Sequence, residues 1–247
     1  MKTSRGLSLI EVTIVLVIIG LLLGGLLIPL SAQMDQQKIE LTKKRLEEIK
    51  EALLGFAIIH NRLPCVDVDK DDVDKDKPDV SPEDGQEDKE PDDPTKCYVS
   101  ENNKKKKYGE GYLPWKDLGV GKYDAWNNPF RYRIKVDKDK KTTITLTLIT
   151  STSKLKVRRS NGGSYLTTSS DSRIIAIIFS CGKNGIPDDD NATGIQSDRK
   201  CSNPGYSNLT YVQDGYIENS FDDILTWLSK NTLMNRLVAA GQWPPAP

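Results

Sequence analysis

The side chains that could do chemistry in this 247-residue chain are few in kind. The one histidine, His60, excludes multi-histidine metal centres and argues against a Ser-His-Asp catalytic arrangement. The chain also contains no P-loop, GxSxG, HExxH or dinucleotide-binding motif. Lysine and arginine number 35, as do aspartate and glutamate, so no net basic charge attracts nucleic acid. These observations predict a protein that is not an enzyme and does not bind nucleic acid directly.

Two groups of acidic residues offer the hard oxygen ligands that calcium prefers. The first group follows the spacing of an EF-hand loop: Asp72, Asp74, Asp76 and Glu83. Lys77 stands where that loop needs glycine, and no flanking helices are predicted. The second group contains Asp188 and Asp190, which are the calcium ligands we expect if the ion binds; a solvated turn is the alternative. The sequence therefore predicts no required cofactor, with calcium as the one ion that these residues could bind.

Four cysteines allow three disulfide pairings. The pairs nearest in sequence are Cys65–Cys97 and Cys181–Cys201, and each would close a polar loop. Each such bond would contribute about 3 kcal/mol by the chain-entropy argument, which matters in a chain with a modest core. Buried, reduced cysteines are the alternative. Since no Cys-x-x-Cys pair occurs, a zinc knuckle or a thioredoxin-type site is not supported.

The elements that position these residues begin with an apolar N-terminus. The run Leu7–Leu30 would extend about 36 Å as a helix, enough to span a bilayer core of roughly 30 Å. Lys2 and Arg5 are expected to keep the short N-terminal flank in the cytoplasm, so the rest of the chain is exported. Glu11 argues against an ordinary signal peptide or plain anchor, because a carboxylate within a span needs a partner.

The stretch Arg5-Gly6-Leu7-Ser8-Leu9-Ile10-Glu11-Val12 resembles the processing site of type IV prepilins and type II secretion pseudopilins. The resemblance implies that a prepilin peptidase cuts after Gly6 and methylates Leu7. It also implies an assembly role for Glu11, whose carboxylate would pair with the Leu7 ammonium of a neighbouring subunit and set the register. The implied partners are the peptidase, other pilin or pseudopilin subunits, and an inner-membrane assembly platform.

We expect an α+β fold in which a long N-terminal helix packs on an antiparallel β-sheet head, as in pilins. Residues 1–6 are a leader, and residues 7–30 are the transmembrane helix and polymerisation segment. Residues 31–60 are the amphipathic half of the helix, and residues 61–247 are the head, with an acidic insertion at 67–94. Pro29 should kink the helix without ending it. The insertion holds 14 acidic residues and 4 lysines, which predicts a solvated loop closed at its base.

Strand-like patterns in the head are followed by a short helix. The strands are expected at Phe130–Val136, Thr142–Thr150, Ile174–Phe179 and Leu209–Val212, and the helix at Asn231–Ala240. The continuous apolar run Ile174–Phe179 should be central. The segment from Asp124 to Tyr132 resembles the D-x-W-G-N-P-x-x-Y turn and strand of pseudopilin heads, with Asn127 where glycine is usual. Two further segments, Ser180–Gly185 and Asp222–Trp227, resemble the loop and closing segment of those heads.

Taken together, the features predict a structural subunit of a type II secretion pseudopilus or a type IV pilus. It would begin as a single-pass protein of the bacterial inner membrane, with a cytoplasmic N-terminus and a periplasmic head, and then enter a filament. The alternative is an anchored or filament-tip adhesin or calcium-responsive protein that binds a basic partner through its acidic loop.

Overall fold

The structure is a computed structural model that divides the chain into two compact units, Met1–Glu40 and Leu41–Pro247. It describes residues 8–67, 84–90, 93–97, 110–135, 153–160, 162–167, 173–192, 201, 209–217 and 220–243. For residues 23–31 only the helical backbone is described. Helix α1 (Leu9–His60) contributes residues to both units, and each unit is considered separately.

In the first unit α1 begins with an apolar stretch, and the helix continues through Pro29, which does not end it, as predicted. Large apolar side chains at almost every position between Leu9 and Leu22 are exposed, from 44% for Val12 to 85% for Leu9. Because these positions are nearly consecutive, they surround the helix and leave no continuous polar face. Among the residues whose side chains are described, no helix is both long and apolar enough to cross a membrane.

The second unit is built around a four-stranded antiparallel sheet with the strand order β3-β4-β6-β8. Its strands are β3 (Glu110–Tyr112), β4 (Arg131–Ile134), β6 (Ile174–Ser180) and β8 (Ile224–Ser229). The central position predicted for β6 is confirmed, and all its residues are buried. Ile178 contributes to one core cluster and Ile177 to another, so both faces of β6 are covered. This double burial explains why its sequence is continuously apolar.

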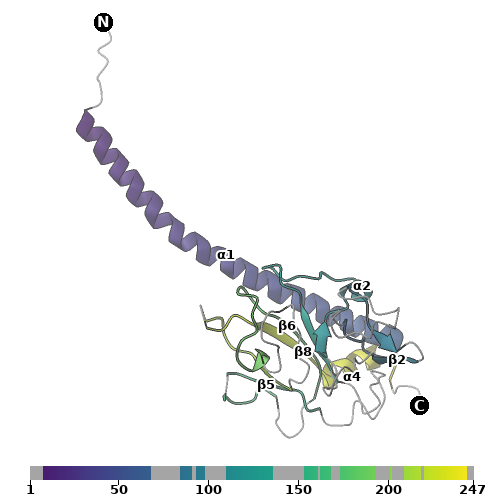
Figure 1. Ribbon diagram of the computed structural model, residues 1–247. Helices are drawn as coiled ribbons and strands as arrows, with labels where there is room; N and C mark the ends of the chain where they lie inside the picture. The colour runs from purple at the N-terminus through teal and green to yellow at the C-terminus, as the bar shows by residue number, and fades with distance from the viewer. Residues whose placement is uncertain are drawn as a thin grey trace, which may run out of the picture. The chain divides into compact units, whose positions relative to one another are not determined.

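The C-terminal part of α1 contributes a buried stripe to the first of these cores. Its apolar residues are buried as predicted: Leu46, Ile49, Leu53 and Phe56. The first three pack in one cluster with Tyr132, Ile178 and Leu228. Helix α4 (Lys230–Ala239) follows β8 directly, as Figure 1 shows, and confirms the helix predicted there. Ser229 caps its start, and Gly241 follows its end with φ +70°.

The described part of this unit also contains two smaller sheets and two short helices. Strand β1 (Lys89–Glu90) pairs antiparallel with β2 (Asp93–Cys97), whereas β5 (Lys156–Arg158) pairs in parallel with β7 (Thr210–Val212). The strand predicted near Leu209–Val212 is thus confirmed, but it lies outside the main sheet and its pairing is parallel. That pairing buries Val157 and Tyr211 in the second core, beneath β6. The strand predicted at Thr142–Thr150 lies outside the described residues, and the short helices are α2 (Trp115–Leu118) and η2 (Asp189–Ala192).

Two disulfides join the cysteines nearest in sequence. Cys65 pairs with Cys97 and Cys181 with Cys201, with Cα–Cα distances of 5.2 and 5.8 Å. The first bond closes the base of the acidic insertion. The EF-hand-like group within the insertion lies outside the described residues.

The described ends of the insertion are partly buried, unlike those of a fully solvated loop. Glu87 forms a two-pronged ion pair with Arg62 at 2.5 Å and accepts a hydrogen bond from the Cys65 N–H at 3.0 Å. Asp67, also buried, accepts a hydrogen bond from the Gly85 N–H at 2.9 Å. The Glu87 carboxylate can be buried here because Arg62 and the Cys65 N–H are its partners.

Candidate functional site

At the start of α1, Glu11 makes a local contact that reasoning from the sequence missed. Its carboxylate accepts a hydrogen bond from the backbone N–H of Ser8 at 2.9 Å. The Ser-x-x-Glu spacing is that of a capping box, in which the third helical residue satisfies the N–H of the cap residue. That spacing was the available signal. Gly6 and Leu7, the residues expected at the processing site, lie outside the described residues.

A second candidate lies where the loop after β6 meets the segment before β8. Asp188, Asp222 and Asp223, here called the acidic cluster, each place one carboxylate oxygen within 4.8 Å of the others. Asp222 and Asp223 are only 7% and 3% exposed. In both, Oδ1 is buried and accepts no hydrogen bond from the described part of the chain. An unsatisfied buried carboxylate oxygen is costly, so the arrangement fits a bound cation.

Main-chain amides hold the acidic cluster in place. The Asn184 N–H donates to Asp222 Oδ2, the Asp188 N–H donates to Asp223 Oδ2, and the Asp222 N–H donates to Asp188 Oδ2, each at 2.8 Å. Gly182 allows the two segments to approach, because a Cβ there would lie 2.2 Å from the Asp222 carbonyl oxygen. With φ +58°, it also adopts a conformation that favours glycine. The cluster is therefore assembled by the backbone of both segments.

The electrostatics of the acidic cluster disfavour charge in the absence of a cation. The pKa of Asp222 is raised to about 6, chiefly by burial and also by the neighbouring Asp188 carboxylate, against the lowering effect of the Asn184 N–H hydrogen bond. Burial also raises the pKa of Asp223 well above its usual value. A bound cation would stabilise the ionised forms of both carboxyl groups.

The consecutive acids of this loop have different partners. Asp190, one of the two calcium ligands expected from the sequence, forms an ion pair with Arg158 of β5. The loop therefore offers Asp188, and not Asp190, to the acidic cluster. Asp189 between them is exposed and has φ +46°, which turns the chain sharply enough to separate its two neighbours.

Asp222 and Asp223 were not predicted as ligands. Two adjacent acids directly before the buried strand β8 were the signal that could have found them. Nothing in the sequence relates them to Asp188, which lies more than thirty positions earlier.

The turn after α2 supports the loop that carries Asp188. Asp124 accepts hydrogen bonds from the Trp126 and Asn128 N–H groups at 2.9 and 2.8 Å and from the Ser180 hydroxyl at 2.5 Å. Asn127 has φ +69°, the left-handed conformation for which glycine is usual and asparagine is tolerated. The Asn128 amide donates to the Gly182 carbonyl at 2.7 Å, which joins the turn to the loop.

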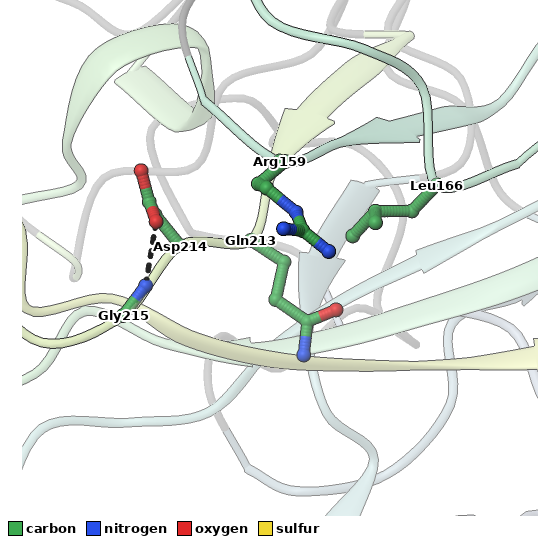
Figure 2. Close-up of a pocket in the computed structure, with 5 residues that line it drawn as sticks. All are labelled: Arg159, Leu166, Gln213, Asp214 and Gly215. Atoms are coloured by element: carbon green, nitrogen blue, oxygen red, sulfur yellow. Dashed lines mark hydrogen bonds between the residues drawn. The ribbon is translucent and has the colours of Figure 1, made fainter.

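An open pocket of about 400 Å³ lies beyond the ends of β5 and β7 (Figure 2). It is lined by Arg159, Leu166, Gln213, Asp214 and Gly215. Figure 2 shows Arg159 extending toward Leu166, whereas the Asp214 carboxylate turns back and accepts a hydrogen bond from the Gly215 N–H at 2.8 Å. These lining residues include no nucleophile paired with a base, so they offer no catalytic arrangement.

Comparison with known proteins finds a family motif at the N-terminus. Residues 1–27 match the family model of the prokaryotic N-terminal methylation motif. No curated protein and no solved structure matches the chain. The chain thus carries, at its N-terminus, the methylation motif that is characteristic of type IV pilin-like proteins.

Proposed function

We propose that this chain is a structural subunit of a type II secretion pseudopilus or a type IV pilus. It is assembled from the bacterial inner membrane after prepilin peptidase removes residues 1–6 and methylates Leu7. The supporting observation is the methylation motif, continuous with a helix whose apolar side chains are exposed between Leu9 and Leu22. A helix without a polar face needs apolar surroundings, which are lipid before assembly and neighbouring apolar helices afterwards.

In this proposal Glu11 has two partners in succession. Within one subunit its carboxylate accepts the Ser8 N–H. In the filament it pairs with the Leu7 ammonium of a neighbouring subunit, and the inner-membrane assembly platform adds the subunits to the filament. Because an uncompensated buried charge is strongly unfavourable, the pair allows only one axial step between subunits.

Variants of Glu11 test this proposal. Glu11→Val should leave membrane insertion and cleavage after Gly6 intact but sharply reduce incorporation into filaments. The Leu7 ammonium of the neighbour would then be buried without its partner, which costs about 3–5 kcal/mol. Glu11→Asp should be intermediate. Glu11→Gln is the matched control, since glutamine can still cap Ser8 but carries no charge. The measurement is the amount of each variant in sheared filaments, normalised to its membrane level.

Two outcomes would contradict the proposal. Incorporation of Glu11→Gln at the wild-type level would show that the cap, not the charge, is what assembly needs. An intact Met1 N-terminus, found by mass spectrometry in cells with active peptidase, would contradict processing altogether. Gly6→Ala should impair the cleavage that this measurement detects.

A specific observation also favours calcium binding in the head, at Asp188, Asp222 and Asp223. The observation is the buried, unsatisfied Oδ1 of both Asp222 and Asp223. Calcium takes six to eight oxygen ligands, so carbonyl groups or water would complete its shell. In major pseudopilins, which the head resembles, the corresponding loop binds calcium. The ion would join the loop after β6 to the segment before β8, which is a structural role.

A further inference from the structure

We infer that Asn191 is the positioning residue of this cation site: it orients Asp223 and ties the site to strand β7. The inference rests on the calcium site proposed above. Asn191 is 1% exposed. Its side-chain amide donates to Asp223 Oδ2 at 2.9 Å and to the Val212 carbonyl at 3.0 Å, while its Oδ1 accepts the Val212 N–H at 2.8 Å.

The three hydrogen bonds explain why the residue is asparagine. Toward Val212, the side chain presents one donor and one acceptor, as a neighbouring strand would. Toward Asp223 it presents a second donor. An amide supplies two N–H groups and an oxygen, whereas a carboxylate would place an acceptor against both the Val212 carbonyl and Asp223.

These contacts determine how Asp223 can meet a cation. Oδ2 of Asp223 receives two donors, the Asn191 amide and the Asp188 N–H. Both bonds fix the rotation of the carboxylate and leave Oδ1 as the oxygen without a donor among the described residues. Asn191 meets Asp223 through its N–H group, while its oxygen accepts the Val212 N–H. Its role is to hold a ligand in the orientation that binding needs.

Calcium affinity tests this role. The full chain is purified in detergent with its disulfides intact, and calcium binding is measured by titration calorimetry. Losing a residue that orients a metal ligand typically costs about 10- to 100-fold in affinity, and we expect a loss of this size for Asn191→Ala. Asn191→Ser keeps a hydroxyl that can bond one of the two partners, Val212 or Asp223, but not both. Its calcium affinity should therefore fall less than that of Asn191→Ala. Asn231→Ala is the matched control, because Asn231 is an exposed asparagine of α4 whose side chain bonds Arg173 and not the acidic cluster.

A second readout separates positioning from general destabilisation. Terbium replaces calcium, and its luminescence lifetimes in H₂O and D₂O count the waters bound to the ion. More waters are expected on the ion in Asn191→Ala and Asn191→Ser than in the wild type and Asn231→Ala. Wild-type affinity and hydration in either folded Asn191 variant would overturn the inference. If the wild type binds neither ion, or if Asp223→Asn binds as well as the wild type, the calcium site itself is wrong.

Discussion

Two disulfide-closed loops of the head hold buried carboxylates in different ways. At the base of the insertion, closed by Cys65–Cys97, Glu87 is held by Arg62 and Lys89. In the loop closed by Cys181–Cys201, the acidic cluster is held by main-chain N–H groups, and two of its buried oxygens accept no hydrogen bond from the described residues. Glu87 has cationic side chains as partners, whereas no ion pair joins the acidic cluster to a cationic side chain among the described residues.

The pKa values of Glu87 and Asp223 are shifted in opposite directions by these different partners. Burial alone would raise the pKa of Glu87, but the Arg62 hydrogen bond, the Cys65 N–H and the Arg62 charge outweigh it and hold the pKa below its usual 4.5. At Asp223 burial prevails, and the pKa is raised. Burial therefore does not by itself decide the direction of the pKa shift of a buried carboxyl group. The partners of the carboxylate decide it, and for Glu87 these include the Arg62 guanidinium.

The largest effect is expected from removing the counter-charge at the insertion. Arg62→Ala should lower the free energy of unfolding by about 3 kcal/mol, because Glu87 stays buried and, among the described residues, keeps only Lys89 as an ion-pair partner. Arg236→Ala is the matched control: its pair with Glu51 is more than half exposed and should contribute below about 1 kcal/mol. Denaturant titration of the full chain in detergent measures both. Equal costs would contradict the view that the insertion base is a buried clamp.

A calcium effect of similar size should appear at the other loop. At 100 times its dissociation constant, calcium should raise the free energy of unfolding by about 2.7 kcal/mol. Asp223→Asn should abolish this increase. Asp190→Asn should retain it, since the Asp190 carboxylate pairs with Arg158 outside the acidic cluster. Thermal melting of each variant with and without calcium measures this stabilisation. If calcium no longer stabilises Asp190→Asn, then Asp190 is a calcium ligand, as the sequence predicts.

Acid should weaken the insertion base. The folded pKa of Glu87 is depressed, so the stability it contributes is fully present above the unfolded value of 4.5 and is lost as pH falls through the folded pKa. Glu87→Gln should therefore be less stable than the wild type at pH 7, and the difference should shrink below about pH 4.5. Unfolding curves between pH 3 and 7 measure this. A difference that stays constant across the range would show that the charge of Glu87 does not matter.

The smallest effect is expected at the turn that supports the acidic cluster. Asn127→Gly should change the free energy of unfolding by no more than about 1 kcal/mol, because glycine adopts φ +69° without strain but loses more entropy on folding. Asn127→Val should cost more, since a β-branched residue is strained in this conformation. A cost for glycine as large as for valine would show that the asparagine side chain, rather than the backbone conformation, is needed there.

Prediction from the sequence succeeded where the signal was local. The helix that ends at His60, the central strand β6 and helix α4 each follow from an apolar pattern within one segment. The pairing of Cys65 with Cys97 and of Cys181 with Cys201 was one of three possibilities, and the fold selects it by bringing each pair within reach. The Ser8–Glu11 cap is also local, because the two residues are three positions apart at the start of one helix.

By itself, the sequence determined the methylation motif and the apolar helix that follows it, because both depend on consecutive residues and need no folded head. Only the tertiary structure decided the composition of the acidic cluster. Asp188 meets Asp222 and Asp223 because β6 and β8 are neighbours, so the loop that follows one strand lies against the segment that precedes the other. The parallel pairing of β7 with β5 likewise places Val212 beside Asn191 and Arg158 beside Asp190. Contacts between distant segments carry no signature in a single sequence, since they depend on how the whole chain packs.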